Sequence, residues 1–221
     1  MPVTQKNPPI RHPVKRLILS CIGLCIMAFG VAFSIRAELG TSPISSVPYV
    51  TAMISGLTVG ETTIIVNLLS IVIELILLRR QFGLRQVLQI PATLLFGSMI
   101  DVADLVLQPL SAAHYIQQWA LCLTGIVVLA LGISVEITAN LVTTAGEGLV
   151  LAICRSAPIQ FSTMKVIFDV TLVCLAIVLS LVYFGRLDGV REGTVAAAIL
   201  VGLITRHTSR LTKKLEAALL N

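Results

Sequence analysis

Charge is the scarcest property of this sequence. Asp, Glu, Lys and Arg make up only 12% of the 221 residues, whereas 56% of the residues are hydrophobic. A soluble domain carries about 25% charged residues, so this composition excludes a water-soluble monomer. Basic residues outnumber acidic ones by 16 to 11, but they do not form the clustered basic face of a soluble nucleic-acid-binding fold. The lipid bilayer is therefore an expected partner, and nucleic acid is not.

Sequence patterns of common catalytic sites are also missing. The chain has no His-Glu-x-x-His, no Gly-x-Ser-x-Gly and no phosphate-binding Gly-x-x-x-x-Gly-Lys-Ser/Thr. Its three histidines are scattered over the tails and one predicted outer loop, and its five cysteines include no Cys-x-x-Cys pair. We therefore expect no enzyme activity, no bound metal and no cofactor.

What the sequence does contain is long apolar stretches. A helix needs about 20 apolar residues to cross the hydrocarbon core of a bilayer. Residues 194–205 are shorter than that, and we count them as a sixth span because they match residues 92–100 in the repeat described next. The predicted fold class is an all-α polytopic membrane protein in which residues 1–221 form a single membrane domain. The five stretches that meet or approach the required length are residues 17–35, 62–78, 87–107, 119–137 and 166–184.

The two halves of the chain resemble each other. Repeat 1 covers about residues 15–108 and repeat 2 about residues 117–206, and residues 207–221 form a predicted interfacial tail. Two copies of one apolar unit indicate a duplicated membrane protein. A shift of 102 positions superimposes two pairs of glycines and one Phe-Gly pair: Gly23 on Gly125, Gly30 on Gly132, and Phe82-Gly83 on Phe184-Gly185.

The basic residues indicate how the spans are oriented. With six spans and a cytoplasmic N-terminus, all of the 16 Lys and Arg residues except Arg36, Arg186 and Arg191 fall on the cytoplasmic side. Such a bias is the rule for membrane proteins. Three spans per repeat then place the two repeats in opposite orientations, with both termini in the cytoplasm. Many secondary transporters are built from inverted repeats of this kind.

Each repeat also contains a short segment interrupted by polar and small residues. The segments are residues 44–57, preceded by Ser42 and Pro43, and residues 144–156, which begin at Thr144. Ser and Thr are good helix caps and Pro fits a first turn, so each segment is predicted to be a short helix. A helix end buried between spans favours an anion or a polar substrate group. The alternatives are a helix lying on the membrane surface and a full crossing.

Ionisable residues within apolar segments are costly and often functional. Lys165 and Asp169 are four residues apart and can pair on one helix face, and Asp169 or Glu147 is the candidate ion-coupling group. Glu147 lies between two glycines, where it has few structural duties. The residues expected to line a substrate site are Ser42, Asn67, Thr144, Glu147, Lys165, Asp169 and Glu192.

The other acidic residues of the spans have simpler interpretations. Asp101, Asp104 and Glu136 lie near predicted span ends and are expected to be solvated or to cap helices. Glu74 lies deep in the second span, about one turn from Arg79. Its carboxylate is expected either to extend toward the basic residues at the span end or to serve a buried site.

A family resemblance rests on motifs in both halves. The first half contains Leu39-Gly40-Thr41-Ser42-Pro43, followed by a short helix and Val59-Gly60. The second half contains Gly146-Glu147-Gly148-Leu149-Val150, then Lys165 and Asp169, then Gly189-Val190-Arg191-Glu192-Gly193-Thr194. In this order and spacing, over about residues 17–206, the motifs resemble the YczE/YyaS/YitT family of bacterial membrane proteins. One branch of that family carries a Gly-Pro-x-Asp turn where this chain has Gly146-Glu147-Gly148, which implies a different ligand. The resemblance implies a multi-pass protein of the bacterial cytoplasmic membrane and leaves the substrate open.

Two functions follow from these observations. The first is a small secondary transporter or exporter of a small polar or anionic solute. The second is a non-transporting scaffold, assembly or regulatory protein, which the short chain and small extramembrane regions favour. A homodimer is compatible with either function, because six short spans enclose little volume.

Overall fold

The computed structural model describes residues 13–157 and 159–219, and its regular structure over these ranges consists of helices with no strand. Two short helices, α2 (Pro43–Ser55) and α7 (Ala145–Ser156), each follow a long one. The connection from α3 to α5 contains η1 (Arg79–Gln81) and α4 (Leu84–Val87). The long helices are α1 (Pro13–Ala37), α3 (Val59–Leu78), α5 (Gln89–Val106), α6 (Tyr115–Ala139), α8 (Phe161–Phe184) and α9 (Glu192–Leu219).

Five of the long helices have the length and composition of membrane spans. They are α1, α3, α5, α6 and α8, and they coincide with the five apolar stretches of the sequence, which confirms the all-α polytopic fold class. The sixth predicted span, residues 194–205, is the apolar first half of the longer helix α9. The predicted tail continues this helix as far as Leu219, and its side chains beyond Thr208 lie outside the described residues.

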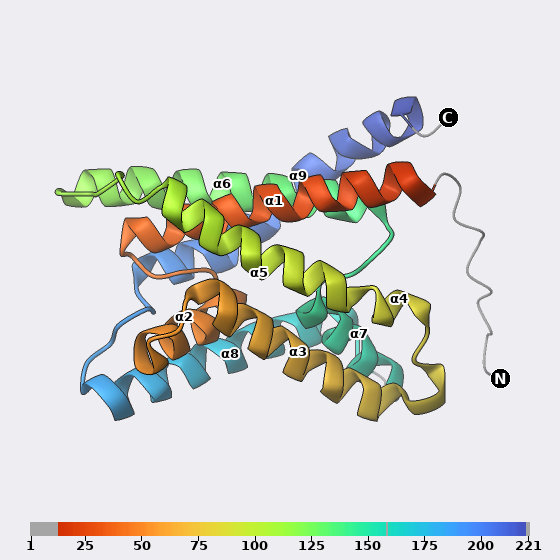
Figure 1. Cartoon of the computed structure of the whole chain (residues 1–221), viewed down its shortest axis with the longest axis horizontal. Coiled ribbons are helices and arrows are strands. Elements are labelled where there is room, and N and C mark those ends of the chain that lie inside the picture. Colours follow the sequence, from red (N-terminus) through yellow and green to blue (C-terminus); the bar gives the residue numbers. More distant parts are fainter. Residues whose placement is uncertain (1–12, 158, 220–221) are drawn as a thin grey trace.

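The helices form two layers, as Figure 1 shows. In one layer α1 packs against both α5 and α6, and α6 packs against α9. In the other layer α2 packs on α8, and α3 packs on α7. Contacts between α3 and α5 join the layers. Helices of the first half run opposite to the helices in equivalent positions of the second half, α1 against α6, α5 against α9 and α3 against α8 (Figure 1).

Glycines allow α1 and α6 to approach each other closely. A Cβ atom added at Gly30 would lie 2.5 Å from the backbone nitrogen of Leu129, and one added at Gly23 would lie 3.1 Å from the carbonyl oxygen of Gly132. Gly125 meets the Gly30 carbonyl in the same way. Close approach of helix backbones through small residues is a main source of stability in membranes, where lipid supplies no hydrophobic driving force between helices. The aligned glycines of the two repeats therefore form the central contact of the fold.

The outer faces of the spans are apolar and exposed, as a lipid-facing surface requires. α8 is the most exposed of the five candidate spans, because only 11% of the residues in its most apolar 18-residue stretch are buried. Val166, Val170 and Val182 are each more than half exposed along it. In water such a surface would aggregate, whereas in a bilayer it is solvated by the acyl chains. The exposure of α8 thus agrees with its role as an outer span.

The two interrupted segments are the short helices α2 and α7, and both begin where the sequence predicts. Ser42 and Thr144 are their N-cap residues, although neither hydroxyl caps its helix with a hydrogen bond. At 1.5 Å per residue, α2 and α7 are roughly 20 Å long, which is too short to cross a hydrocarbon core of about 30 Å. The loop before α2 is held to the start of α9, because the Gly193 N–H donates to the Leu39 carbonyl at 2.8 Å.

Candidate functional site

The first turns of α2 and α7 meet inside the helix assembly. A Cβ atom added at Gly146, in the first turn of α7, would lie 2.5 Å from Cδ1 of Ile44, in the first turn of α2. Phe168 of α8 borders the same point at 3.7 Å. Gly146 therefore provides the space in which these two helix ends touch. The ends come from different halves of the chain, so neither half can build this region alone.

Charged side chains gather beside this meeting point. Lys165 and Asp169 of α8 form an ion pair with 2.6 Å between Nζ and Oδ1, and each side chain is about a quarter exposed. Glu147, half buried on α7, lies within electrostatic range of both, and also of Glu136 near the end of α6. Glu147 and Asp169 thus share the Lys165 ammonium group, and Glu136 lies within electrostatic range of Glu147. Glu136 was predicted to be solvated or to cap a helix, and solvation is wrong because its residue is only 6% exposed.

Hydroxyl groups line the start of α2, on the other side of the meeting point. Ser42, Ser45 and Ser46 are all buried. Ser42 Oγ donates to Ser45 Oγ at 3.1 Å, and Ser46 Oγ donates to the Pro43 carbonyl at 2.6 Å. Because Ser42 bonds another hydroxyl group, it leaves the first-turn amides of α2 without a side-chain cap. The α2 side of the region is therefore polar and uncharged, whereas the α7 side is charged.

A second buried polar cluster adjoins α7, and little in the sequence pointed to it. Glu74 of α3 and Gln89 of α5 are 2% and 3% exposed. A Cβ atom at Gly148 of α7 would fall 2.7 Å from Glu74 Oε2 and would also overlap the Gln89 amide. The interpretation that Glu74 extends toward the basic end of its span is wrong, since its carboxylate points into this three-helix contact. The only sequence signal for the cluster was a carboxylate within an apolar stretch.

One predicted site residue, Glu192, lies elsewhere. Glu192 is about half exposed at the start of α9 and pairs with Arg191 at 3.3 Å. Its neighbour Gly193 packs on Cys122 near the start of α6, about 14 residues and so roughly 20 Å along that helix from Glu136. Asn67 is half buried on α3, two turns from Glu74 on the same face. Of the seven predicted residues, the structure brings together Glu147, Lys165 and Asp169. Ser42 and Thr144 stand at the starts of α2 and α7, beside the point where these helices meet.

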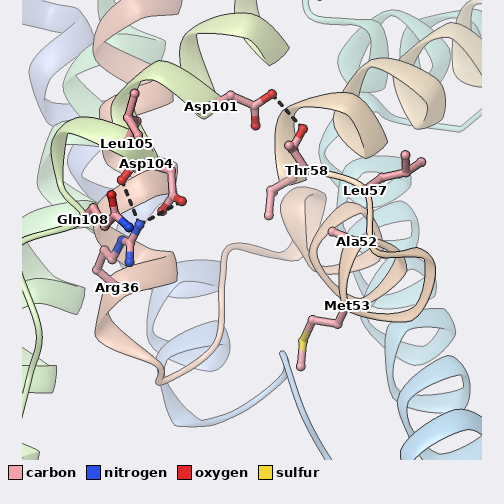
Figure 2. A pocket seen from close by; sticks show the side chains of 10 residues that line it. Arg36, Ala52, Met53, Leu57, Thr58, Asp101, Asp104, Leu105 and Gln108 are labelled. Atoms are coloured by element: carbon pink, nitrogen blue, oxygen red, sulfur yellow. Dashed lines mark hydrogen bonds and ion pairs between the residues drawn. The ribbon is translucent and has the colours of Figure 1, made fainter.

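A pocket of about 470 Å³ opens at the opposite ends of the spans. Figure 2 shows Arg36 and Asp104 on one side of it and Met53 and Leu57 on the other. The Arg36 guanidinium lies 2.9 Å from the Asp104 carboxylate and also donates to the Asp104 carbonyl at 2.8 Å. The pocket thus has an ion-paired wall and an apolar wall between α1, α2, α3 and α5.

Asp101, on the rim of this pocket, caps α3. Its carboxylate accepts hydrogen bonds from Thr58 Oγ1 at 2.7 Å and from the Gly60 N–H at 2.8 Å (Figure 2). Thr58 and Glu61 complete a capping box at the same helix start. The prediction that Asp101 serves as a cap is confirmed, and Asp104 is engaged by Arg36.

Comparisons with known proteins agree with a membrane protein. A family model described as a family of unknown function (DUF6198) matches residues 14–210. The chain is 29% identical over 187 residues to the "Uncharacterized membrane protein YczE" of Bacillus subtilis (strain 168). These 187 residues make up 84% of this chain and 81% of that relative. No solved structure matches the chain.

Proposed function

We propose that this chain, which belongs to the DUF6198 family, is a small secondary transporter of a polar solute. Its relationship to YczE confirms the resemblance drawn from the sequence motifs, and the protein is an integral membrane protein with several apolar helices. We place it in the bacterial cytoplasmic membrane with both termini in the cytoplasm.

The observation that carries this proposal is the meeting of α2 and α7. Secondary transporters commonly bind substrate near the midplane, where interrupted helices from two repeats end and turn their amide groups toward the site. Here the first turn of α2 touches the first turn of α7 at Ile44 and Gly146. The ion pair of Lys165 and Asp169 and the carboxylate of Glu147 lie beside that contact. A scaffold has no need for ionisable groups at such a place, because they are costly to bury.

The charges around the site restrict the solute. Glu136, Glu147 and Asp169 supply three carboxyl groups and Lys165 one ammonium group, so a simple anion would be repelled on the α7 side. On the α2 side, uncapped amides and the buried hydroxyl groups of Ser42 and Ser45 can bind an acceptor group. A polar or zwitterionic solute, with a donor near Glu147 and an acceptor near Ser42, fits this arrangement best.

The pattern of helix contacts supports an inverted repeat. α1 packs on α5 as α6 packs on α9, and α2 packs on α8 as α7 packs on α3. When the helices of repeat 1 are replaced by their counterparts in repeat 2, the contact of α1 with α5 becomes that of α6 with α9, and the contact of α2 with α8 becomes that of α7 with α3. Helices in equivalent positions run in opposite directions (Figure 1). Two inverted halves of three spans each would give alternating access by rocking of one half against the other.

Cysteine labelling tests the inverted arrangement. In a background without the five native cysteines, Ser55→Cys and Ser156→Cys place thiols at the exposed last residues of α2 and α7. We expect a membrane-impermeant maleimide added outside intact cells to label Ser55→Cys only. Ser156→Cys is expected to react only after the membrane is permeabilised. Labelling of both positions from the same side would rule out the inverted repeat.

A ligand screen tests transport-type binding. The full chain in lipid nanodiscs is heated with a panel of amino acids, small amines and small organic acids. A ligand that binds the folded state at 100 times its Kd stabilises it by about 2.7 kcal/mol. We expect at least one polar compound to raise the melting temperature of the parent protein and of Glu61→Gln, but not of Glu147→Gln or Asp169→Asn. Glu61 is an exposed capping-box residue in which Gln serves equally well.

A screen without any stabilising compound, with both site variants as stable as the parent, would favour a non-transporting scaffold. Uptake of a stabilising compound into proteoliposomes then separates a transporter from a binding protein.

A further inference from the structure

The cluster of Glu74, Gln89 and Gly148 is separate from the ion pair of α8, and two of its oxygen atoms lack hydrogen-bond partners. Glu74 Oε2 and Gln89 Oε1 are both buried and have no hydrogen-bond partner. Their residues are 2% and 3% exposed. Two acceptor oxygens left unpaired in the interior of a helical membrane protein are costly, and an ionised carboxylate is more costly still. Gln89 and Gln86 are hydrogen-bonded to the Glu74 side chain, yet Glu74 Oε2 and Gln89 Oε1 each remain without a donor.

We propose that Glu74 is the proton-binding group of this protein and that it is protonated when α7 is packed against α3 as described. A proton taken from water onto Glu74 Oε2 converts the carboxylate to a neutral carboxyl group and turns this oxygen from an acceptor into a donor. One proton thus removes the buried charge and supplies the missing donor. This inference rests on the proposed function, since it assigns the coupling ion of the transporter.

A metal ion fits the cluster less well than a proton. Among the described residues, no group of three or more His, Cys, Asp or Glu side chains is close enough to hold a metal. Hard cations such as Ca²⁺ and Mg²⁺ take about six or more oxygen ligands, whereas this cluster offers two unpaired oxygens. A proton needs only one acceptor.

The groups around Glu74 leave its charge largely unbalanced. α5 contributes the neutral Gln89 and α4 the neutral Gln86, while α7 contributes Arg155, which lies at the exposed far end of that helix. η1 contributes Arg79, which is exposed. Along α3 itself no other charged residue occurs between Glu61 and Arg79. Among the side chains that the structure describes, Arg155 is the cation within electrostatic range of the Glu74 carboxylate, and it is exposed.

Gly148 connects this cluster to the proposed solute site. The backbone of Gly148 touches the Glu74 and Gln89 side-chain ends, and the preceding residue is Glu147. Loss of the proton from Glu74 would place an ionised carboxylate against the first turn of α7, where it must be hydrated or leave the contact. Either response moves the turn that carries Glu147. The charge state of Glu74 and the shape of the solute site are coupled through these two adjacent residues.

Infrared difference spectroscopy on the full chain in lipid nanodiscs tests this proposal without any solute. A pH change is used to deprotonate carboxyl groups, and the carbonyl stretch of the protonated acid is followed. We expect Glu74→Gln to lose one such band from the parent difference spectrum, and Glu61→Gln to keep it. Glu74→Asp, which retains a carboxyl group, is expected to keep the band at a shifted frequency. This second variant also guards against a folding defect in Glu74→Gln.

A folded Glu74→Gln protein with the complete parent spectrum would overturn the proposal. So would a band that is displaced by sodium chloride but not by choline chloride, because that result would identify a sodium site. Loss of the band together with failure of the ligand screen would leave the proton site standing and remove the transporter. If the screen finds a ligand but the band is unchanged in Glu74→Gln, the transporter proposal stands and the proton site at Glu74 is ruled out.

Discussion

Alanine at Gly30 is expected to lower the melting temperature of the protein by several degrees. The new Cβ atom would lie 2.5 Å from the Leu129 nitrogen and 2.7 Å from its Cα atom. Both atoms belong to the backbone, so no side-chain rotation can relieve the overlap, and α1 must move away from α6. Overpacking costs about 1–3 kcal/mol and occasionally more, and about 1 kcal/mol corresponds to roughly 2–4 °C in a protein of this size.

A matched control is available in α9. A Cβ atom added at Gly202 would have no neighbouring atom within 4 Å, so Gly202→Ala adds the same atom without a clash. Alanine improves helix propensity by about 1 kcal/mol over glycine in water, so this variant is expected to be as stable as the parent or slightly more stable. Thermal unfolding in the same detergent measures both variants. Equal melting temperatures for the two would show that the contact between α1 and α6 is looser than described.

Replacement of Lys165 by methionine is expected to destabilise the protein and to abolish ligand binding. The substitution keeps a side chain of similar length but removes the ammonium group that Asp169 and Glu147 share. Breaking a fully buried pair costs about 3–5 kcal/mol. Because both partners are about a quarter exposed, we expect a smaller loss of about 1–3 kcal/mol, measured as the change in melting temperature.

A double variant distinguishes charge from packing in this prediction. If the loss comes from an uncompensated carboxylate, Lys165→Met combined with Asp169→Asn should recover at least half of the lost stability. Residues in direct contact are expected to show such non-additivity. A double variant that is as unstable as the sum of the single ones would show that Lys165 acts through the packing of its aliphatic stem. Binding should remain lost in the double variant under both outcomes.

The helices and the starts of α2 and α7 could be predicted from the sequence because these features depend on local chemistry. Apolar length alone identifies the five spans. Ser42 with Pro43, and Thr144 before a small-residue run, predict where the short helices begin, and both starts are confirmed. The pair of Lys165 and Asp169 also follows from local spacing, since residues four apart share one face of a helix.

The burial of Glu74 and Glu136 could not be predicted, because it depends on which helices lie beside them. Position along a span indicates depth in the membrane but not the direction in which a side chain points. Glu136 is one turn from the end of α6, yet it is buried. Gln89 and Gly148 come from helices distant in sequence, and their contact with Glu74 depends on the packing of α5 and α7 on α3. Glu192 was misplaced for the related reason that its motif lies near the other end of the assembly.

The glycine contact between α1 and α6 has a consequence for the origin of the chain. Gly23 contacts Gly132 and Gly30 contacts Gly125. Because Gly125 and Gly132 are the equivalents of Gly23 and Gly30, the same two positions of each half contact each other in reversed order. This reciprocity is the mark of an isologous interface, in which identical surfaces pair. A single half-length ancestor could therefore have assembled with a copy of itself inserted in the opposite direction. If two such copies fused, each position could then diverge, which would account for Ala176 standing 102 residues after Glu74. The proposed proton site needs Glu74 and Gln89 from the first half and Gly148 from the second, so a single half could not have formed it alone.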